Sequence, residues 1–558
     1  MKDNKTMRKK APVLCLGALA LVAGLSACGK GNVPDTEETL EVFCCKLGYG
    51  SDWCKNILDE FEKEDWVKEK YPNLQVVYDA SADRSEVGTR LNAGEGVNTI
   101  DLVFSDGLSG YIGTDYAGKE YSVNLTDTVY NTKVPGEDIT VYEKLDDDYK
   151  RAAMFYSYGQ SSFGQELPFN SYNFFWASGM MGIVYNETIL QNAFGIDHAP
   201  RTTDELAEVL ATVTRGNENY NKGYAIMWSA GGEYSQYLYN VWWGQYEGVD
   251  NYYNYYQGVS FDGEDYIERS SDIFKQEGRR EALRALIQMI SSESGFRYGK
   301  GATAEVKATQ RYFFRGEGVF MANGDWLAEE SKDALAGTTD VFKMMKTPIL
   351  SAITKKTKTI QSDAKLREVV AKIDENYPTA AAAGLSDVSE EDYKTILEAR
   401  SVHYALGSGC DALIPSYANG KDVACDFLRY MATDKAQEIY AKSTGGASLP
   451  FKYNLKDSPN YDGFTDMQKA RIEMMQNSVH GSNVLPQGAN FPLVKFGKLG
   501  DWSSYACTGG VAIYSRNGSL DPASEDSAEK AFARDLDYWT TNGGAKWSDT
   551  LRLAGYTN

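Results

Sequence analysis

Four consecutive residues, Asn323-Gly324-Asp325-Trp326, bring together an amide, a carboxylic acid and an indole. They follow the apolar run 318–322, which predicts a β-strand. Flat aromatic rings stack on the apolar C–H faces of sugars, and carboxylates and amides hydrogen-bond to hydroxyl groups. These residue types predict a sugar-binding site in which Asp325 and Trp326 contact the ligand. The alternative for Trp326 is a tryptophan packed in a core.

A second polar group, Ser105-Asp106-Gly107, ends the apolar run 100–104. With strands predicted at 40–45 and 74–78 and a helix from about residue 52, this run indicates a parallel α/β sheet. Such sheets bind ligands in loops at the carboxyl ends of their strands. Ser105 and Asp106 are therefore candidate ligand residues, and a helix cap is the alternative for Asp106.

Signatures of catalysis and of metal binding are absent from the sequence. The three histidines, at 198, 403 and 480, are far apart, and there is no His-Glu-x-x-His or nucleophile elbow. The segment 295–301 is one residue too short for a phosphate-binding loop. We therefore predict no enzyme, no metal and no cofactor, although a glycosidase pair among the many carboxylates stays open.

The composition of the chain further restricts the class of protein. At 558 residues the chain is too long for one core, so two or more lobes are expected. A net charge of -21 argues against nucleic acid or an anionic membrane surface as partner. Of the eight cysteines, the six from Cys44 onward fit no zinc pattern, and we expect mostly free or buried thiols with room for one bridge.

The amino terminus reads as a secretory signal. Basic residues precede the apolar run 13–25, which ends in Leu25-Ser26-Ala27-Cys28. This ending resembles a bacterial lipobox, and the resemblance implies that Cys28 becomes the first mature residue and carries acyl chains such as palmitate. The polar stretch 28–39 would then be a lipidated tether on the extracellular face of the cell membrane. The alternative is an ordinary cleaved signal with a chance cysteine.

Further elements follow from periodicity and from turn residues. Helices are predicted from Thr202 and over 234–246, 280–290, 302–314 and 422–442, and strands over 182–186, 224–228, 318–322 and 407–414. Helix-like stretches occur near 366–373 and 390–399, and the tail 457–558 reads as mostly helical. The segment 109–168 gives no clear element.

Several weak motifs occur in a fixed order along the chain. They are Gly48-Tyr49-Gly50, 101–107 (DLVFSDG), Val184-Tyr185-Asn186, 314–326 (FRGEGVFMANGDW), Asn419-Gly420-Lys421 and Gly445-Gly446. With the lipobox, this series resembles family 1 extracellular solute-binding proteins of ABC importers, the group that includes maltose-binding protein, over roughly residues 40–558. The resemblance implies an α/β, two-lobed periplasmic-binding-protein-like (type II) fold with three interlobe crossings and a central ligand cleft.

The same resemblance places the crossings near Ser178, Leu406 and Gly446. It divides the chain into a signal peptide (1–27), a tether (28–39), an N-lobe (40–177 and 406–446) and a C-lobe (178–405 and 447–558). The ligand would lie between these lobes.

The resemblance also assigns site residues. It makes Trp326 the stacking platform, and it adds Tyr49, Trp176, Ser178, Trp228, Tyr234 and Trp502 to the candidate ligand residues. Lobe packing is an equal alternative for Trp228 and Tyr234. Relatives carry an acidic residue near the position of Ser178 and Gly179, so the resemblance does not by itself imply a maltodextrin specificity.

The function that the sequence favours is a lipid-anchored, monomeric receptor that binds an oligosaccharide and delivers it to the transmembrane subunits of an ABC permease. One alternative is the same fold with a peptide or organic acid as ligand. An anionic ligand would favour clustered arginines, and the nominated stretches are acidic and aromatic instead. The other alternative is a surface glycoside hydrolase.

Overall fold

The computed structural model covers most of the chain after residue 33. It describes residues 34–46, 48–81, 83–93, 100–105, 108–113, 120–147, 149–150, 171–228, 234–262, 265–269, 271–290, 294–298, 305–405, 410–476, 483–485, 493, 528–529, 532–533, 536 and 543–554. The predictions for the signal, Cys28, Asp106, Cys507 and Trp502 lie outside these residues. Within them, no helix is long and apolar enough to cross a membrane.

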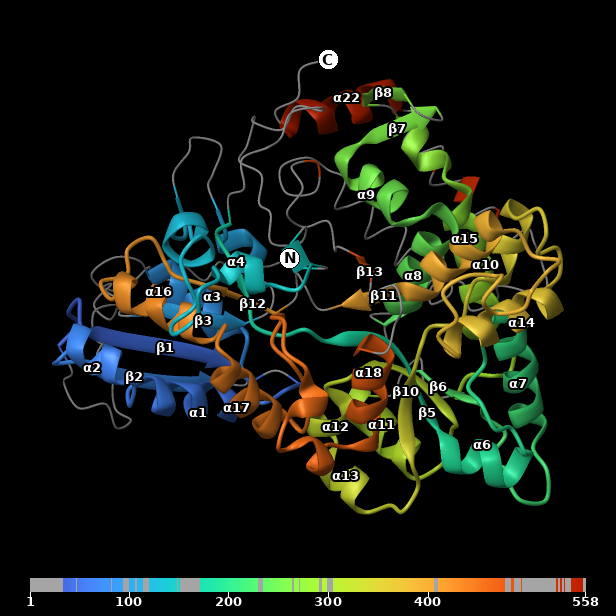
Figure 1. The fold of residues 1–558 in the computed structure, drawn as a ribbon, viewed down its shortest axis with the longest axis horizontal. Coiled ribbons are helices and arrows are strands. Elements are labelled where there is room, and N and C mark those ends of the chain that lie inside the picture. Colours follow the sequence, from blue (N-terminus) through green and yellow to red (C-terminus); the bar gives the residue numbers. More distant parts are fainter. Residues whose placement is uncertain are drawn as a thin grey trace, which may run out of the picture.

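One five-stranded sheet forms the first lobe (Figure 1). Its order is β2-β1-β3-β12-β4, with β1 Thr39–Cys45, β2 Gln75–Ser81, β3 Leu102–Ser105, β4 Phe174–Phe175 and β12 Asp411–Leu413. The strands β1, β2 and β3 are parallel, which confirms the arrangement predicted from their apolar runs. β12 runs antiparallel to both β3 and β4.

Helices cover this sheet and bury aromatic side chains against it. They are α1 Asp52–Phe61, α2 Asp65–Lys70, α3 Ser85–Ala93, α4 Val141–Lys144, α16 Lys421–Tyr430 and α17 Asp434–Thr444, with short turns η1 Leu108–Tyr111 and η2 Thr126–Tyr130. The single helix predicted over 422–442 is wrong, because Thr433 accepts a hydrogen bond from Ala436 N (3.2 Å) and caps a new helix. The five described cysteines, at 44, 45, 54, 410 and 425, are buried thiols of this lobe.

A second, mixed sheet forms the second lobe. Its order is β13-β11-β5-β9-β6 with β10 on the side of β5, where β5 is Met180–Asn186, β6 Ile226–Met227, β9 Phe320–Gly324, β10 Phe342–Met345, β11 Val402–Ala405 and β13 Asn483–Leu485. The central strand β5 is antiparallel to β9, β10 and β11. β9 is the predicted strand that leads into Asp325.

Helices pack around this second sheet as well. They are α6 Glu187–Phe194, α7 Thr203–Arg215, α8 Ser235–Glu247, α9 Val249–Gln257, α10 Glu277–Ile290, α11 Val306–Phe314, α12 Leu327–Glu330, α13 Lys332–Ala336, α18 Asp466–Gln476 and α22 Gly543–Leu553; η4 Ser271–Lys275 and the hairpin β7 Val259–Asp262 with β8 Asp265–Arg269 complete the set. Thr202 caps α7 as predicted and accepts from Glu205 N (3.2 Å). The Glu205 carboxylate accepts from Arg201 N (2.6 Å) instead of completing the box at Thr202.

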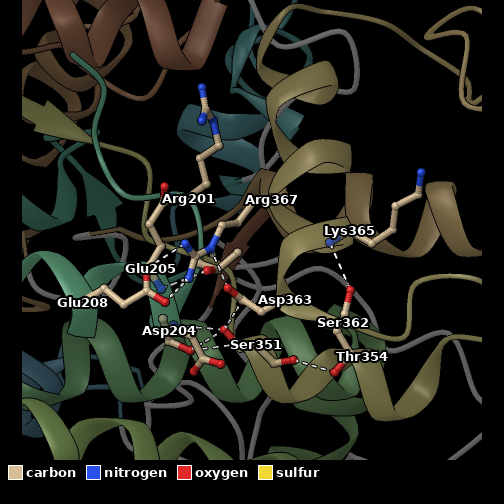
Figure 2. Close-up of polar contacts among 12 residues, drawn as sticks. Arg201, Asp204, Glu205, Glu208, Ser351, Thr354, Ser362, Asp363, Lys365 and Arg367 are labelled. Atoms are coloured by element: carbon tan, nitrogen blue, oxygen red, sulfur yellow. Dashed lines mark hydrogen bonds and ion pairs between the residues drawn. The ribbon is translucent and has the colours of Figure 1, made fainter. Parts of the chain in front are cut away.

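A small helical unit with its own apolar core joins the second lobe at α7. It comprises η5 Ser351–Lys356, α14 Asp363–Asp374 and α15 Glu390–Ser401. Figure 2 shows its polar connection to α7: the two terminal nitrogens of Arg367 each lie 2.8 Å from the Glu208 carboxylate, and Asp204 N donates to Ser351 Oγ (3.0 Å). This unit is therefore anchored to the second lobe through α7.

The chain passes between the lobes at neighbouring points. One crossing is the segment 176–179 between β4 and β5, and a second connects β11, which ends at Ala405, to β12, which begins at Asp411. Ser178 pairs with Ser448 in an antiparallel bridge, with Ser178 N donating to Ser448 O (2.7 Å). Leu449 and Phe451 still pack in the first lobe's core, whereas α18 packs on β10 of the second sheet. The lobe boundaries near Ser178, Leu406 and Gly446 stay predictions.

Candidate functional site

Trp326 lies at the junction of the two lobes. It follows β9 at the start of α12, it is partly buried, and it packs against the cores of both lobes. A Cβ atom on Gly48 of the first lobe would stand 2.5 Å from its Cδ1, and one on Gly324 of the second lobe would stand 1.9 Å from its Cζ3. The two glycines thus admit the indole ring between the lobes, because any side chain there would overlap it.

Tyrosines surround the same ring. Tyr49 of the first lobe and Tyr237 of α8 meet Trp326 edge to face, with ring centroids 6.3 Å and 6.1 Å away. Tyr234 stacks on Tyr237 at 5.0 Å and remains partly exposed. The structure therefore brings together three of the aromatic residues named from the sequence, Tyr49, Tyr234 and Trp326.

Asp325 is fully buried beneath this cluster. Its carboxylate accepts a hydrogen bond from the Tyr49 hydroxyl and forms an ion pair with Arg471 Nε of α18 (3.1 Å). Burial raises the pKa of Asp325, and the positive charge of Arg471 opposes that rise. The Asp325 carboxylate thus interacts with protein groups, Tyr49 from the first lobe and Arg471 from α18.

The other described candidates lie inside the lobes. Trp176 is fully buried, stacks on Trp53 at 4.8 Å and donates to Asp411 O (3.1 Å), and Trp228 is 3% exposed in the second lobe's core. Ser178 is buried at the first crossing, and Ser105 is buried at the end of β3, where its hydroxyl has no partner among the residues described. In this arrangement of the lobes these four side chains are packed in the protein.

A cavity of about 710 Å³ also lies between the lobes. Asp147 of the first lobe borders it, and the second lobe supplies the end of α8, the start of α9, Lys356 and the end of α15. Its walls carry carboxylates from Glu247, Asp250 and Glu398. Among the described residues that line it there is none of the predicted ligand residues, and Tyr234 and Trp326 lie near the opposite end of α8.

Two features of the junction were missed by sequence reasoning. Arg471 and Tyr237 contact site residues but stand in segments described only as helical. An ion pair between distant segments leaves no local pattern, although the aromatic density of 234–246 was visible. In the described part of the chain, no group of three or more His, Cys, Asp or Glu side chains could hold a metal ion.

Comparison with known proteins identifies the fold. No protein-family model and no curated protein match the chain. A Streptococcus pneumoniae solute-binding protein in complex with the blood group A-trisaccharide matches with a TM-score of 0.53 and 15% identity, over 90% of this chain and 100% of its own. Maltose-bound MalE3 of T. maritima gives 0.51 and 14%, over 90% and 99%. An ABC transporter solute-binding protein of Thermotoga lettingae bound with α-D-tagatose gives 0.51 and 14%, over 89% and 99%.

These structures share two α/β lobes with this chain. The protein therefore has the two-lobed fold of periplasmic solute-binding proteins, as the order of its motifs implied.

Proposed function

We propose that this protein is the substrate-binding component of an ABC importer and that its ligand is a sugar. The observation that carries this proposal is the position of Trp326, a partly exposed indole held between the cores of both lobes. An aromatic ring at that point is available to a ligand that enters the junction beside it. The structural neighbours whose names report a bound sugar support the same class of ligand.

The finer form of the proposal names an oligosaccharide as cargo. Trp326 and Tyr234 supply stacking faces, Tyr49 packs edge to face on Trp326, and the carboxylate-lined cavity at the other end of α8 offers room for further sugar units. A ligand that binds one arrangement of the lobes more tightly makes that arrangement predominate, and the permease recognises it as the loaded state. Attachment through lipidated Cys28, an extracellular position and a monomeric state complete this proposal.

Calorimetry with maltotriose, xylotriose and the blood group A-trisaccharide tests the ligand class. For a sugar that binds, we expect Trp326→Ala to weaken affinity about tenfold or more, since aromatic anchors carry over about 1.4 kcal/mol. Trp66→Ala is the matched control, because Trp66 is a partly buried tryptophan that packs only on the first lobe, 5.7 Å from Phe61. Equal affinity in wild type and Trp326→Ala would refute the site, and sugar cleavage during the titration would refute a receptor.

A further inference from the structure

Arg471 on α18 contacts two crossing segments at once. It is 3% exposed, and its terminal nitrogens donate to Ser178 O (3.3 Å), Gly446 O (3.3 Å) and Ser448 Oγ (3.1 Å). Ser178 belongs to the crossing from β4 to β5, and Ser448 is its bridge partner. A planar guanidinium with five donors in fixed directions is suited to joining several acceptors in this way.

The remaining nitrogen of the same group faces Asp325. Arg471 Nε donates its hydrogen to Gln468 Oε1 (3.1 Å) and forms an ion pair with Asp325 Oδ2 at 3.1 Å, and Gln468 Nε2 donates to the backbone oxygen of Asp325 (2.7 Å). Asp325 N donates in turn to Met180 O (3.0 Å) on β5. The two backbone hydrogen bonds hold residue 325 to α18 and to β5, and the ion pair attracts its carboxylate to Arg471.

Tyr49 supplies the contact from the other side. It lies in the turn after β1, is 3% exposed, and donates its hydroxyl hydrogen to Asp325. Because β1 belongs to the first sheet and β9 to the second, this hydrogen bond joins the lobes directly beside Trp326. A buried bond to a charged acceptor is lost as soon as the lobes separate, because water then replaces it.

We propose that the Tyr49–Asp325 bond is an interlobe latch, and that Arg471 is the positioning residue that presents Asp325 to it from the crossing segments. Only the biological role of the latch rests on the proposed function, because the movement of the lobes can be measured without ligand. When the lobes part, Arg471 keeps the carboxylate in place, and Tyr49 finds its acceptor again on closure.

Distances between spin labels on the ligand-free, full chain test the latch. Labels at Lys442→Cys on α17 and Asp333→Cys on α13 report on the two lobes, and both sites are exposed. Removing one hydroxyl with Tyr49→Phe should increase the ratio of long to short distances about tenfold or more, the effect expected for a hydrogen bond to a charged group. A distance distribution identical to that of the wild type would overturn the latch.

The chain offers a matched control. Tyr71 donates to Asp426 Oδ2 (2.9 Å), and both residues lie in the first lobe, so Tyr71→Phe loses the same kind of bond without any change between lobes. We expect its distance distribution to match that of the wild type. An equal shift in Tyr71→Phe would show a general loss of stability and would also overturn the latch.

A second variant keeps the proposal testable if Tyr49→Phe does not fold. Arg471→Lys keeps the charge but cannot reach both crossing segments and Asp325 together, so it should lengthen the distances in the same direction. Unchanged distances in Arg471→Lys would refute its positioning role. Because no sugar is present in these measurements, a shift without any sugar binding in calorimetry would retain the latch and refute the proposed function alone.

Discussion

Gly324→Ala is the sharpest test of the packing around Trp326. The new Cβ would lie 1.9 Å from Cζ3 of the indole and 2.2 Å from both Cε3 and Cη2. Carbon atoms in contact prefer about 3.5 Å or more, so the ring must move by roughly 1.5 Å. Gly48 already borders the ring from the first lobe, with a Cβ position 2.5 Å from Cδ1, which blocks that side. The indole must therefore leave its present place at the junction.

The expected cost of this overpacking is about 1–3 kcal/mol of the free energy of unfolding. Affinity for a sugar identified by calorimetry should fall about tenfold with it, because the stacking face no longer has its orientation. Gly463→Ala is the control, since nothing lies within 4 Å of its Cβ position. Urea denaturation measures the stability of both variants. If Gly324→Ala retained the wild-type stability and affinity, the ring would not be confined as described.

Three further substitutions test charges elsewhere in the protein. Burial and the charge of Arg471 lower the pKa of His403 from 6.5 to about 4. As the pH falls from 6.5 to 4 the unfolded chain is therefore protonated first, and the free energy of unfolding should fall by up to about 3 kcal/mol. His403→Gln should not show this loss when its stability is measured by urea denaturation. Burial raises the pKa of Asp101 from 3.8 to about 6. Over the same fall in pH the folded state is therefore protonated first, and the free energy of unfolding should rise by up to about 3 kcal/mol. Asp101→Asn should not show this gain in urea denaturation. Glu208→Ala should cost only about 1 kcal/mol, and less in high salt, because this partner of Arg367 is 66% exposed. A larger cost that salt does not change would contradict a screened surface pair.

The sequence was most informative where apolar runs and turn residues agreed. The strands near 40–45, 74–78 and 100–104 were predicted with their parallel arrangement, because short apolar runs separated by a helical pattern allow few other structures. The break between α16 and α17 was missed because the apolar periodicity continues through it, and the decisive signal was a single cap at Thr433. The mixed pairing of the second sheet depends on contacts between distant segments, which no local pattern records.

The sequence named candidate site residues by their type but could not say which of them are buried. Trp326 and Trp176 are the same kind of side chain near predicted strands, yet one lies between the lobes and the other stacks on Trp53 within a core. What separates them is the neighbour on the facing element: glycines leave space beside Trp326, and Trp53 covers Trp176. That difference is set by tertiary packing, so the sequence could nominate both and could not choose.

The proposed latch and the Trp326 indole both act on the equilibrium between closed and parted lobes. This predicts whether Tyr49→Phe should strengthen or weaken sugar binding. In the structure Gly48 packs directly on Trp326, so a sugar that stacks on the covered part of the ring must first part the lobes there. The free energy of parting is then subtracted from the intrinsic affinity, as for any binding-competent state that is only partly populated. Tyr49→Phe lowers that cost and should strengthen sugar binding, whereas Trp326→Ala removes the stacking face and should weaken it. A loss of affinity in both variants would mean that the sugar binds to the closed junction.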